Sequence, residues 1–182
     1  MSERRKFTKV VVLCEDRQQG NFMRGWLKER GYGDRQIRLE QCPRGRSCGY
    51  DYVLAQYPKE VQVLRKATVH SALVALMDED GQGYQTRMEK YGQSLRRMNV
   101  DRRADGEAIA LLLPMRNVET WICSLKGEHV EEDMDYKRKC VEGDAQPAGR
   151  ALANLSEREL ESAPTSLRNA RSELSIRITE LE

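Results

Sequence analysis

The chain has 182 residues, a length that suits one domain with a substantial core. Charged residues make up 33% of it and the mean hydropathy is -0.74, while no apolar stretch approaches the roughly 20 residues needed to span a bilayer. Because the basic N-terminus leads into a predicted strand and not into the apolar region of a signal peptide, we expect a cytoplasmic protein without membrane contact.

The net charge of +2 conceals a gradient along the chain. Residues 1–50 carry 12 Lys or Arg against 6 Asp or Glu, residues 51–125 carry 10 of each kind, and residues 126–182 carry 9 against 13. Contacts to phosphate supply most of the non-specific affinity for nucleic acid, so the basic N-terminal part is compatible with DNA or RNA as a partner. Solvated helix faces also collect Arg and Lys, and charge alone does not decide between the two interpretations.

Four segments predict β-strands. Unbroken apolar runs at 10–14, 72–77 and 109–113 indicate strands that are buried on both faces, and the alternating pattern at 37–42 indicates a less buried strand. Helix-like stretches separate these segments. Buried strands that alternate with helices are typical of a mainly parallel central sheet with helices on both faces, so we expect an α/β fold.

Amphipathic helices are predicted between the strands and after the last of them. The second helix contains Pro58, which we expect to open a new first turn because proline has no N–H to donate inside a helix. A short helix is expected after Asn117, a favoured N-cap residue, with Glu119 in its first turn. The helices expected between the strands cover residues 18–30, 51–67 and 84–98.

The chain beyond residue 125 is expected to add to the α/β domain of residues 1–125. Residues 126–150 are acidic and contain Gly and Pro, which indicates a loop. Residues 151–182 are expected to form C-terminal helices on the same domain. Their apolar stripe, which packs on the body of the domain or on a second copy of the chain, consists of Leu167, Ala170, Leu174, Ile178 and Leu181.

Carboxylates follow two of the predicted strands. Glu15 ends the first apolar run, and Asp78 and Asp80 follow the second, two residues apart and therefore pointing the same way on an extended chain. The carboxyl ends of parallel strands meet at one edge, where Glu119 also falls. Two such charges about 5 Å apart repel by roughly 3 kcal/mol at an effective dielectric near 20, and a hard divalent cation would reverse this. The pattern predicts a magnesium site.

These residues resemble a known family. The run Val-Val-Val-Leu-Cys-Glu15, followed later by Asp78-Glu-Asp80-Gly-Gln-Gly83, resembles the Toprim domain, which has a glutamate after its first strand and Asp-x-Asp-x-x-Gly after its third. Residues 114–121 are similar to a segment of small stand-alone Toprim-like bacterial proteins, some associated with phage defence. The resemblance spans about residues 8–125. The chain departs from the family pattern at Asp16, because a glycine commonly follows the glutamate in Toprim domains. The Asp16 side chain would crowd a substrate or add a further metal ligand.

The resemblance implies a Toprim/Rossmann-like fold and a metal-dependent nuclease of the Toprim and overcoming-lysogenization-defect type, acting as an effector or subunit in bacterial defence. Asp78 and Asp80 would hold Mg²⁺ or Mn²⁺ with a phosphodiester, and Glu15 would be a third ligand or the general base. Glu119 would be either a further site residue or an acid with no role beyond its place in the first turn of a helix. The guanidinium groups expected to grip phosphate are those of Arg44, Arg46 and Arg116.

Two other functions remain open at this stage. The first is a Toprim-fold module that binds nucleic acid or a partner without chemistry, in which the acidic segment and the C-terminal helix would contact a partner protein or form a homodimer. The second is phosphoryl transfer on a small molecule by a receiver-like or phosphatase-like domain. That class typically requires a lysine after a late strand, and no lysine follows Leu113, so we rank it last.

Overall fold

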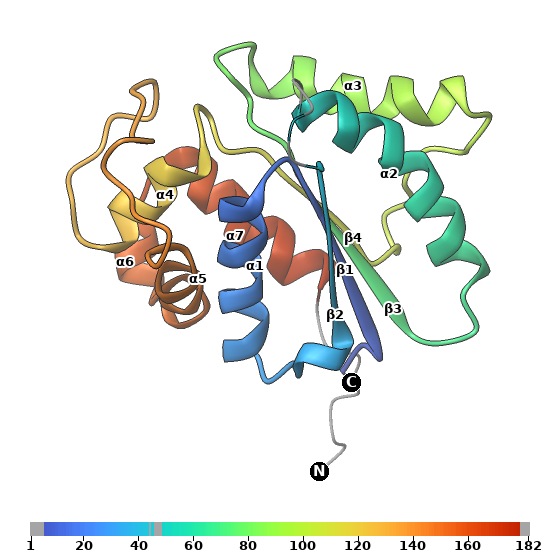
Figure 1. Cartoon of the computed structure of the whole chain (residues 1–182), viewed down its shortest axis with the longest axis horizontal. Helices are drawn as coiled ribbons and strands as arrows, with labels where there is room; N and C mark the ends of the chain where they lie inside the picture. The colour runs from blue at the N-terminus through green and yellow to red at the C-terminus, as the bar shows by residue number, and fades with distance from the viewer. Residues whose placement is uncertain (1–5, 44, 46–48, 179–182) are drawn as a thin grey trace.

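A parallel sheet forms the centre of the computed structural model, which describes residues 6–43, 45 and 49–178. Within these ranges the sheet has four strands in the order β2-β1-β3-β4, and every neighbouring pair is parallel (Figure 1). The expected α/β fold with a parallel sheet is therefore confirmed. The strands are β1 (Lys9–Cys14), β2 (Ile37–Gln41), β3 (Ser71–Leu76) and β4 (Ile109–Leu112).

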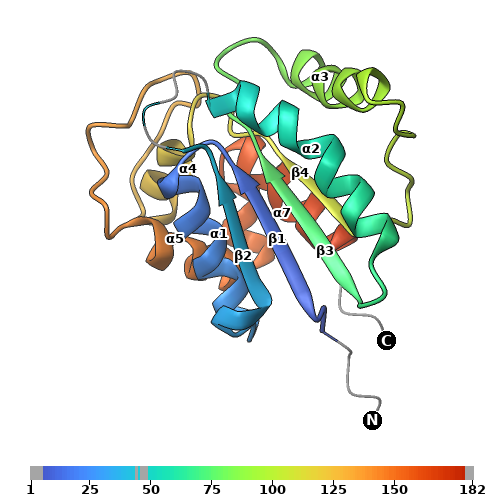
Figure 2. The same ribbon diagram turned by 45° about the vertical axis from the view of Figure 1, so that its right-hand side comes forward.

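Helices cover both faces of this sheet. Figure 2 shows α2 and α3 on one face, while α1, α4, α5 and α7 lie on the other. In the ranges described above, no helix combines the length and the apolar character that crossing a membrane requires. The helices are α1 (Arg17–Glu29), α2 (Gly49–Lys66), α3 (Tyr84–Arg97), α4 (Val118–Leu125), α5 (Ala145–Asn154), α6 (Glu157–Glu161) and α7 (Thr165–Arg177), with a short 3₁₀ turn, η1 (Asp34–Gln36).

The unbroken apolar runs reflect burial on both sides of the sheet. In β1, Val10 and Val12 belong to the core under α1, α4, α5 and α7, whereas Val11 and Leu13 belong to the core under α2 and α3. Successive side chains of a strand point to opposite faces, so a strand between two helical layers needs apolar residues at every position.

Pro58 lies inside α2, and the expectation that it would open a new helix is wrong. The helix continues through it because the flanking Tyr57 and Val61 are completely buried in the core. Tertiary packing of these side chains offsets the backbone hydrogen bond that proline cannot donate.

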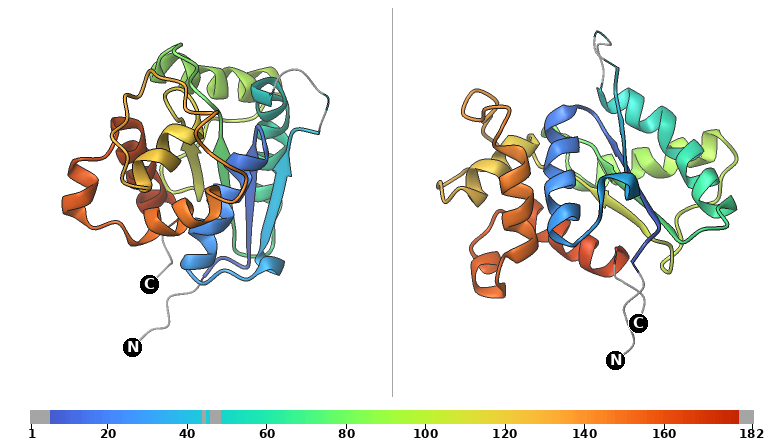
Figure 3. Two further views of the ribbon diagram at one scale, coloured as in Figure 1. Left: turned by 60° about the vertical axis from the view of Figure 1, so that its left-hand side comes forward. Right: turned by 60° about the horizontal axis from the view of Figure 1, so that its bottom comes forward.

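The segment 126–150 is not a loop throughout, because α5 begins at Ala145 and takes up its last part. Figure 3 shows α5 alongside α1. A Cβ atom placed on Gly149 would lie 1.9 Å from the backbone oxygen of Phe22, and one on Gly25 would lie 2.1 Å from the backbone oxygen of Gln146. The glycine that suggested a loop instead permits contact between two helix backbones, and Pro147 is tolerated in the first turn of α5.

The C-terminal stripe packs on the body of the same chain. Its members Leu167, Ala170, Leu174 and Ile178 are buried in the core on the α1 side of the sheet, and Leu181 lies outside the described residues. From α7, Glu173 Oε1 accepts a hydrogen bond from the Leu111 N–H at 3.2 Å, on the edge strand β4. Of the two packing partners expected for this stripe, the body of the same chain is the one observed, so this apolar face is not available to a second copy.

We predict that Gly25→Ala and Gly149→Ala each lower the free energy of unfolding by about 2–3 kcal/mol, because the added methyl group must push α1 and α5 apart. Urea denaturation measures the change. The control is Gly92→Ala in α3, where an added Cβ meets no atom within 4 Å. That variant should gain about 0.5–1 kcal/mol. An equal change in the free energy of unfolding in all three variants would contradict the close contact between α1 and α5.

Candidate functional site

Glu15 and Asp78 meet at the carboxyl ends of the neighbouring strands β1 and β3. The Asp78 N–H donates a hydrogen bond to Glu15 Oε1 at 2.7 Å. Gln19 Nε2 donates to Asp78 Oδ1 at 2.7 Å, and the Glu15 N–H donates to Gln19 Oε1 at 2.9 Å. One fully buried amide thus connects both acids. Each carboxylate keeps one oxygen, Glu15 Oε2 or Asp78 Oδ2, with no hydrogen-bond donor among the described residues.

Gln19 is a site residue that the sequence interpretation missed. Asp16 is the N-cap of α1, and its Oδ1 accepts a hydrogen bond from the Gln19 N–H at 2.9 Å. The spacing Asp-x-x-Gln is that of a capping box, in which the third helical residue reaches back over the N-terminus. The pattern was therefore a usable signal for Gln19. Asp16 therefore serves as the helix cap of α1.

The start of α2 lies against Glu15. A Cβ atom on Gly49 would lie 2.7 Å from Glu15 Cβ and 2.9 Å from Glu15 Oε2. Gly49 thus allows the start of α2 to approach the glutamate closely. The two arginines expected to bind phosphate in the preceding loop, Arg44 and Arg46, lie outside the described residues.

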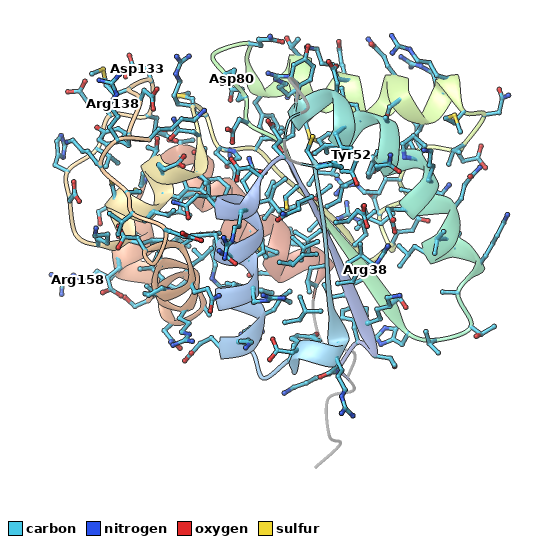
Figure 4. The ribbon with its side chains drawn as sticks, viewed as in Figure 1. Arg38, Tyr52, Asp80, Asp133, Arg138 and Arg158 are labelled. Atoms are coloured by element: carbon cyan, nitrogen blue, oxygen red, sulfur yellow. The ribbon has the colours of Figure 1, made fainter. Side chains whose placement is uncertain are left out.

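The turn after β3 has an unusual backbone. Asp80 adopts a φ of +51°, in the left-handed region that non-glycine residues rarely enter, and Gly81 and Gly83 follow with φ of +69° and +91°. Glu79 holds this turn, because its N–H donates to the Pro114 carbonyl at 2.8 Å and its Oε1 accepts from the Gly83 N–H at 3.0 Å. The result is an exposed Asp80 beside a buried Asp78. Figure 4 labels Asp80 on the loop that leads into α3.

A buried cation lies beneath this turn. Arg87, on α3, is 1% exposed. Its Nε donates to the Glu79 carbonyl at 3.0 Å, its Nη2 pairs with Asp80 Oδ2 at 3.4 Å, and its guanidinium lies 4.8 Å from the centre of the Tyr50 ring. Asp80 therefore pairs with an arginine. Nothing in the sequence distinguishes Arg87 from the surface arginines of α3, which is why the sequence interpretation missed it.

Glu119 and Arg116 lie near the same edge but make fewer contacts. Glu119 is 6% exposed in the first turn of α4, and its charge contributes to raising the pKa of Asp78. Asn117 is the N-cap residue of α4 as expected, although its Nδ2 donates to Asp135 Oδ1 at 2.9 Å in place of a capping bond. Arg116 is half-buried. Its charge is a minor cause, after the hydrogen bonds from the Lys137 N–H and the Asn117 amide, of the lowered pKa of Asp135.

The acids are partly assembled as a ligand set. Glu15 and Asp78 are joined by a hydrogen bond, whereas Asp80 pairs with Arg87 and Glu119 shares no hydrogen bond with the other three among the described residues. Over the same residues, no group of three or more His, Cys, Asp or Glu side chains is placed to hold a metal ion. A cation bound by three of these acids therefore requires Asp80 or Glu119 to move.

Burial makes the two joined acids hold their protons more tightly. It raises the pKa of Glu15 to about 7, and the charges of Asp80 and Asp16 act in the same direction, against the Asp78 N–H and Arg87. Burial, followed by the charge of Glu15, also raises the pKa of Asp78 well above its usual range. Full ionisation of the pair is therefore destabilising, and a bound cation would relieve this.

We predict that, without divalent cations, stability falls as pH rises from about 4.5 to 7. The pKa of Glu15 is higher in the folded than in the unfolded chain, so the folded state binds more protons and loses this advantage as pH rises through both values. The rise in the pKa of Glu15 corresponds to about 3 kcal/mol in the free energy of unfolding. Urea denaturation at pH 4.5 and 8 should show that Glu15→Gln loses less unfolding free energy between these pH values than the unchanged protein. An unchanged loss in that variant, or an equal reduction in the control Glu128→Gln at an exposed position, would contradict this origin.

Comparison of the chain with models of known protein families found no match, and comparisons with curated proteins and with solved structures found none either.

Proposed function

We propose that the protein is a Mg²⁺- or Mn²⁺-dependent phosphodiesterase that hydrolyses nucleic acid. The observation that carries this proposal is the convergence of Glu15 and Asp78 at the carboxyl ends of adjacent parallel strands, joined by a 2.7 Å hydrogen bond. This is the edge at which α/β sheets bind ligands. Action as an effector or subunit of a bacterial defence system belongs to the same proposal and rests on the resemblance of residues 114–121.

The donor set fits a hard divalent cation. The free oxygens Glu15 Oε2 and Asp78 Oδ2 are of the kind that Mg²⁺ prefers, and the adjacent Asp80 would complete the set after turning away from Arg87. A bound ion would polarise a phosphodiester and stabilise the charge that develops during hydrolysis. Gln19 would hold Asp78 in place, and Glu15 would serve as a ligand or accept the proton of the attacking water.

One observation favours the alternative of a non-catalytic binding module with a Toprim-like fold. Arg87 already supplies a positive charge at this edge, and its contact with Asp80 takes the place that a metal ion would hold. In that function the protein would bind nucleic acid or a partner with no cation at the acids. The response of the folded protein to Mg²⁺ distinguishes the two functions.

We predict that 5 mM Mg²⁺ raises the melting temperature at pH 8. Ligand at 100 times its Kd stabilises a folded protein by about 2.7 kcal/mol, which corresponds to roughly 5–10 °C for a chain of this length. Asp78→Asn should lose most of this gain, since it keeps the acceptor oxygen for Gln19 but not the charge. The matched control is Asp51→Asn at an exposed position of α2. Absence of any shift with Mg²⁺ or Mn²⁺ would favour the binding module.

We predict that the purified protein cleaves labelled DNA or RNA in Mg²⁺ or Mn²⁺. Glu15→Gln and Asp78→Asn should each lower the cleavage rate by about 10²–10⁴-fold, because groups that transfer protons or stabilise charge in the transition state contribute on this scale. The rate is measured on single- and double-stranded substrates of both kinds, with Asp51→Asn as the control. Cleavage that survives in the double variant Asp78→Ala/Asp80→Ala would overturn the assignment.

A further inference from the structure

Two cysteines outside the candidate site are in direct contact. Cys123, on α4, is completely buried, and Cys140, in the segment between α4 and α5, is half-buried. Their Sγ atoms lie 3.6 Å apart, although 17 positions separate the two residues in sequence. Both are free thiols. Contact between the sulfurs is the first requirement for a disulfide.

Tertiary contacts on both sides of Cys140 hold its segment against α4. Before it, Asp135 Oδ1 accepts a hydrogen bond from Nδ2 of Asn117, the N-cap residue of α4, at 2.9 Å. After it, Asp144 Oδ2 pairs at 3.0 Å with Lys126 Nζ, at the C-terminal end of α4. The contact between the two thiols is therefore a product of the fold.

The thiol pair lies next to the turn of α4 that carries Glu119. Cys140 Sγ donates a hydrogen bond to the Glu119 carbonyl at 3.7 Å, and Cys123 follows Glu119 by one helical turn. A covalent bond between the thiols would therefore fix the segment against the helix that places Glu119 near Asp78.

The two thiols differ in how an oxidant reaches them. Cys140 is partly exposed, whereas Cys123 has no exposed surface. An oxidant in solution therefore reacts first at Cys140, and Cys123 is placed to attack the product. Burial, followed by the hydrogen bond with Cys123, raises the pKa of Cys140 to about 12, so its thiolate is scarce at neutral pH. The reaction is therefore slow, and the pair responds to sustained oxidation.

We propose that hydrogen peroxide converts Cys123 and Cys140 into a reversible disulfide, which locks residues 126–140 onto α4. The Cys140 thiol loses its proton and its sulfur attacks one peroxide oxygen, so that an S–O bond forms, the O–O bond breaks and hydroxide leaves. The Cys123 sulfur then attacks the Cys140 sulfur, an S–S bond forms, the S–O bond breaks and water leaves with the Cys123 proton. Two thiols are oxidised, and the peroxide is reduced to two molecules of water. The proposal does not depend on metal binding or cleavage at Glu15 and Asp78.

Peptide mapping after oxidation tests the proposal on the full chain. Trypsin separates Cys123 from Cys140, because they fall in the peptides 117–126 and 140–150. After incubation with hydrogen peroxide at pH 8 and blocking of the remaining thiols, we expect these two peptides to be joined and to separate again in dithiothreitol. We also expect the melting temperature to rise by roughly 5–10 °C, because the bond closes a loop within the chain. Absence of the joined peptides would overturn the proposal.

Three variants distinguish this lock from unspecific oxidation. Cys140→Ser should lose the joined peptides and the rise in melting temperature, while its hydroxyl can still donate to the Glu119 carbonyl. Cys123→Ala should stop at the sulfenic acid of Cys140, which the nucleophile dimedone captures. The matched control Cys42→Ser, at another half-buried free cysteine, should keep both effects. A rise in melting temperature that persists in Cys140→Ser, or that disappears in Cys42→Ser, would contradict the assignment.

Discussion

The parallel pairing of β1 with β3 is the constraint on which the candidate site depends. Its register aligns Lys9 with Ser71 and Leu13 with Ala75, so the two strands end side by side. Beyond the strand ends, the Asp78 N–H donates a hydrogen bond to the Glu15 carboxylate. This bond follows the backbone hydrogen bonds that pair β1 with β3, with a side chain as the acceptor. Two acids that are 63 positions apart in sequence are thereby held in direct contact. The hydrophobic cores on both faces stabilise the sheet strongly enough to keep these buried charges together.

The two helical layers differ in how they serve this sheet. On one face, α1 and α5 cross so closely that glycines are needed at the contact, and Asp16 and Gln19 at the start of α1 position the acids. On the other face, α2 and α3 carry tyrosines and arginines. There Arg87 lies beneath the turn that follows β3, with its guanidinium against the Tyr50 ring. The first layer thus fixes the geometry of the acids, and the second places a buried positive charge beside Asp80.

The proposed function and its alternative differ in what balances the charge of the acids that follow β1 and β3. Asp80, exposed and in a left-handed conformation, has its carboxylate against the guanidinium of Arg87. Glu15 and Asp78 form no salt bridge with any residue that the structure describes, and burial keeps their pKa values high. A divalent cation would pair with these two acids. In a binding module, Glu15 would instead remain partly protonated at neutral pH.

The local sequence determined the strands, most helices and the placement of acids at strand ends, because these follow from the period of apolar residues and from capping chemistry. Tertiary structure decided the rest. Pro58 stays inside α2 and Gly149 inside α5 because packing partners far along the chain compensate for poor local helix propensity. Likewise, the contacts of Gln19 with Asp78 and of Arg87 with Asp80 required the fold, since no periodic pattern specifies which polar side chains meet at a sheet edge.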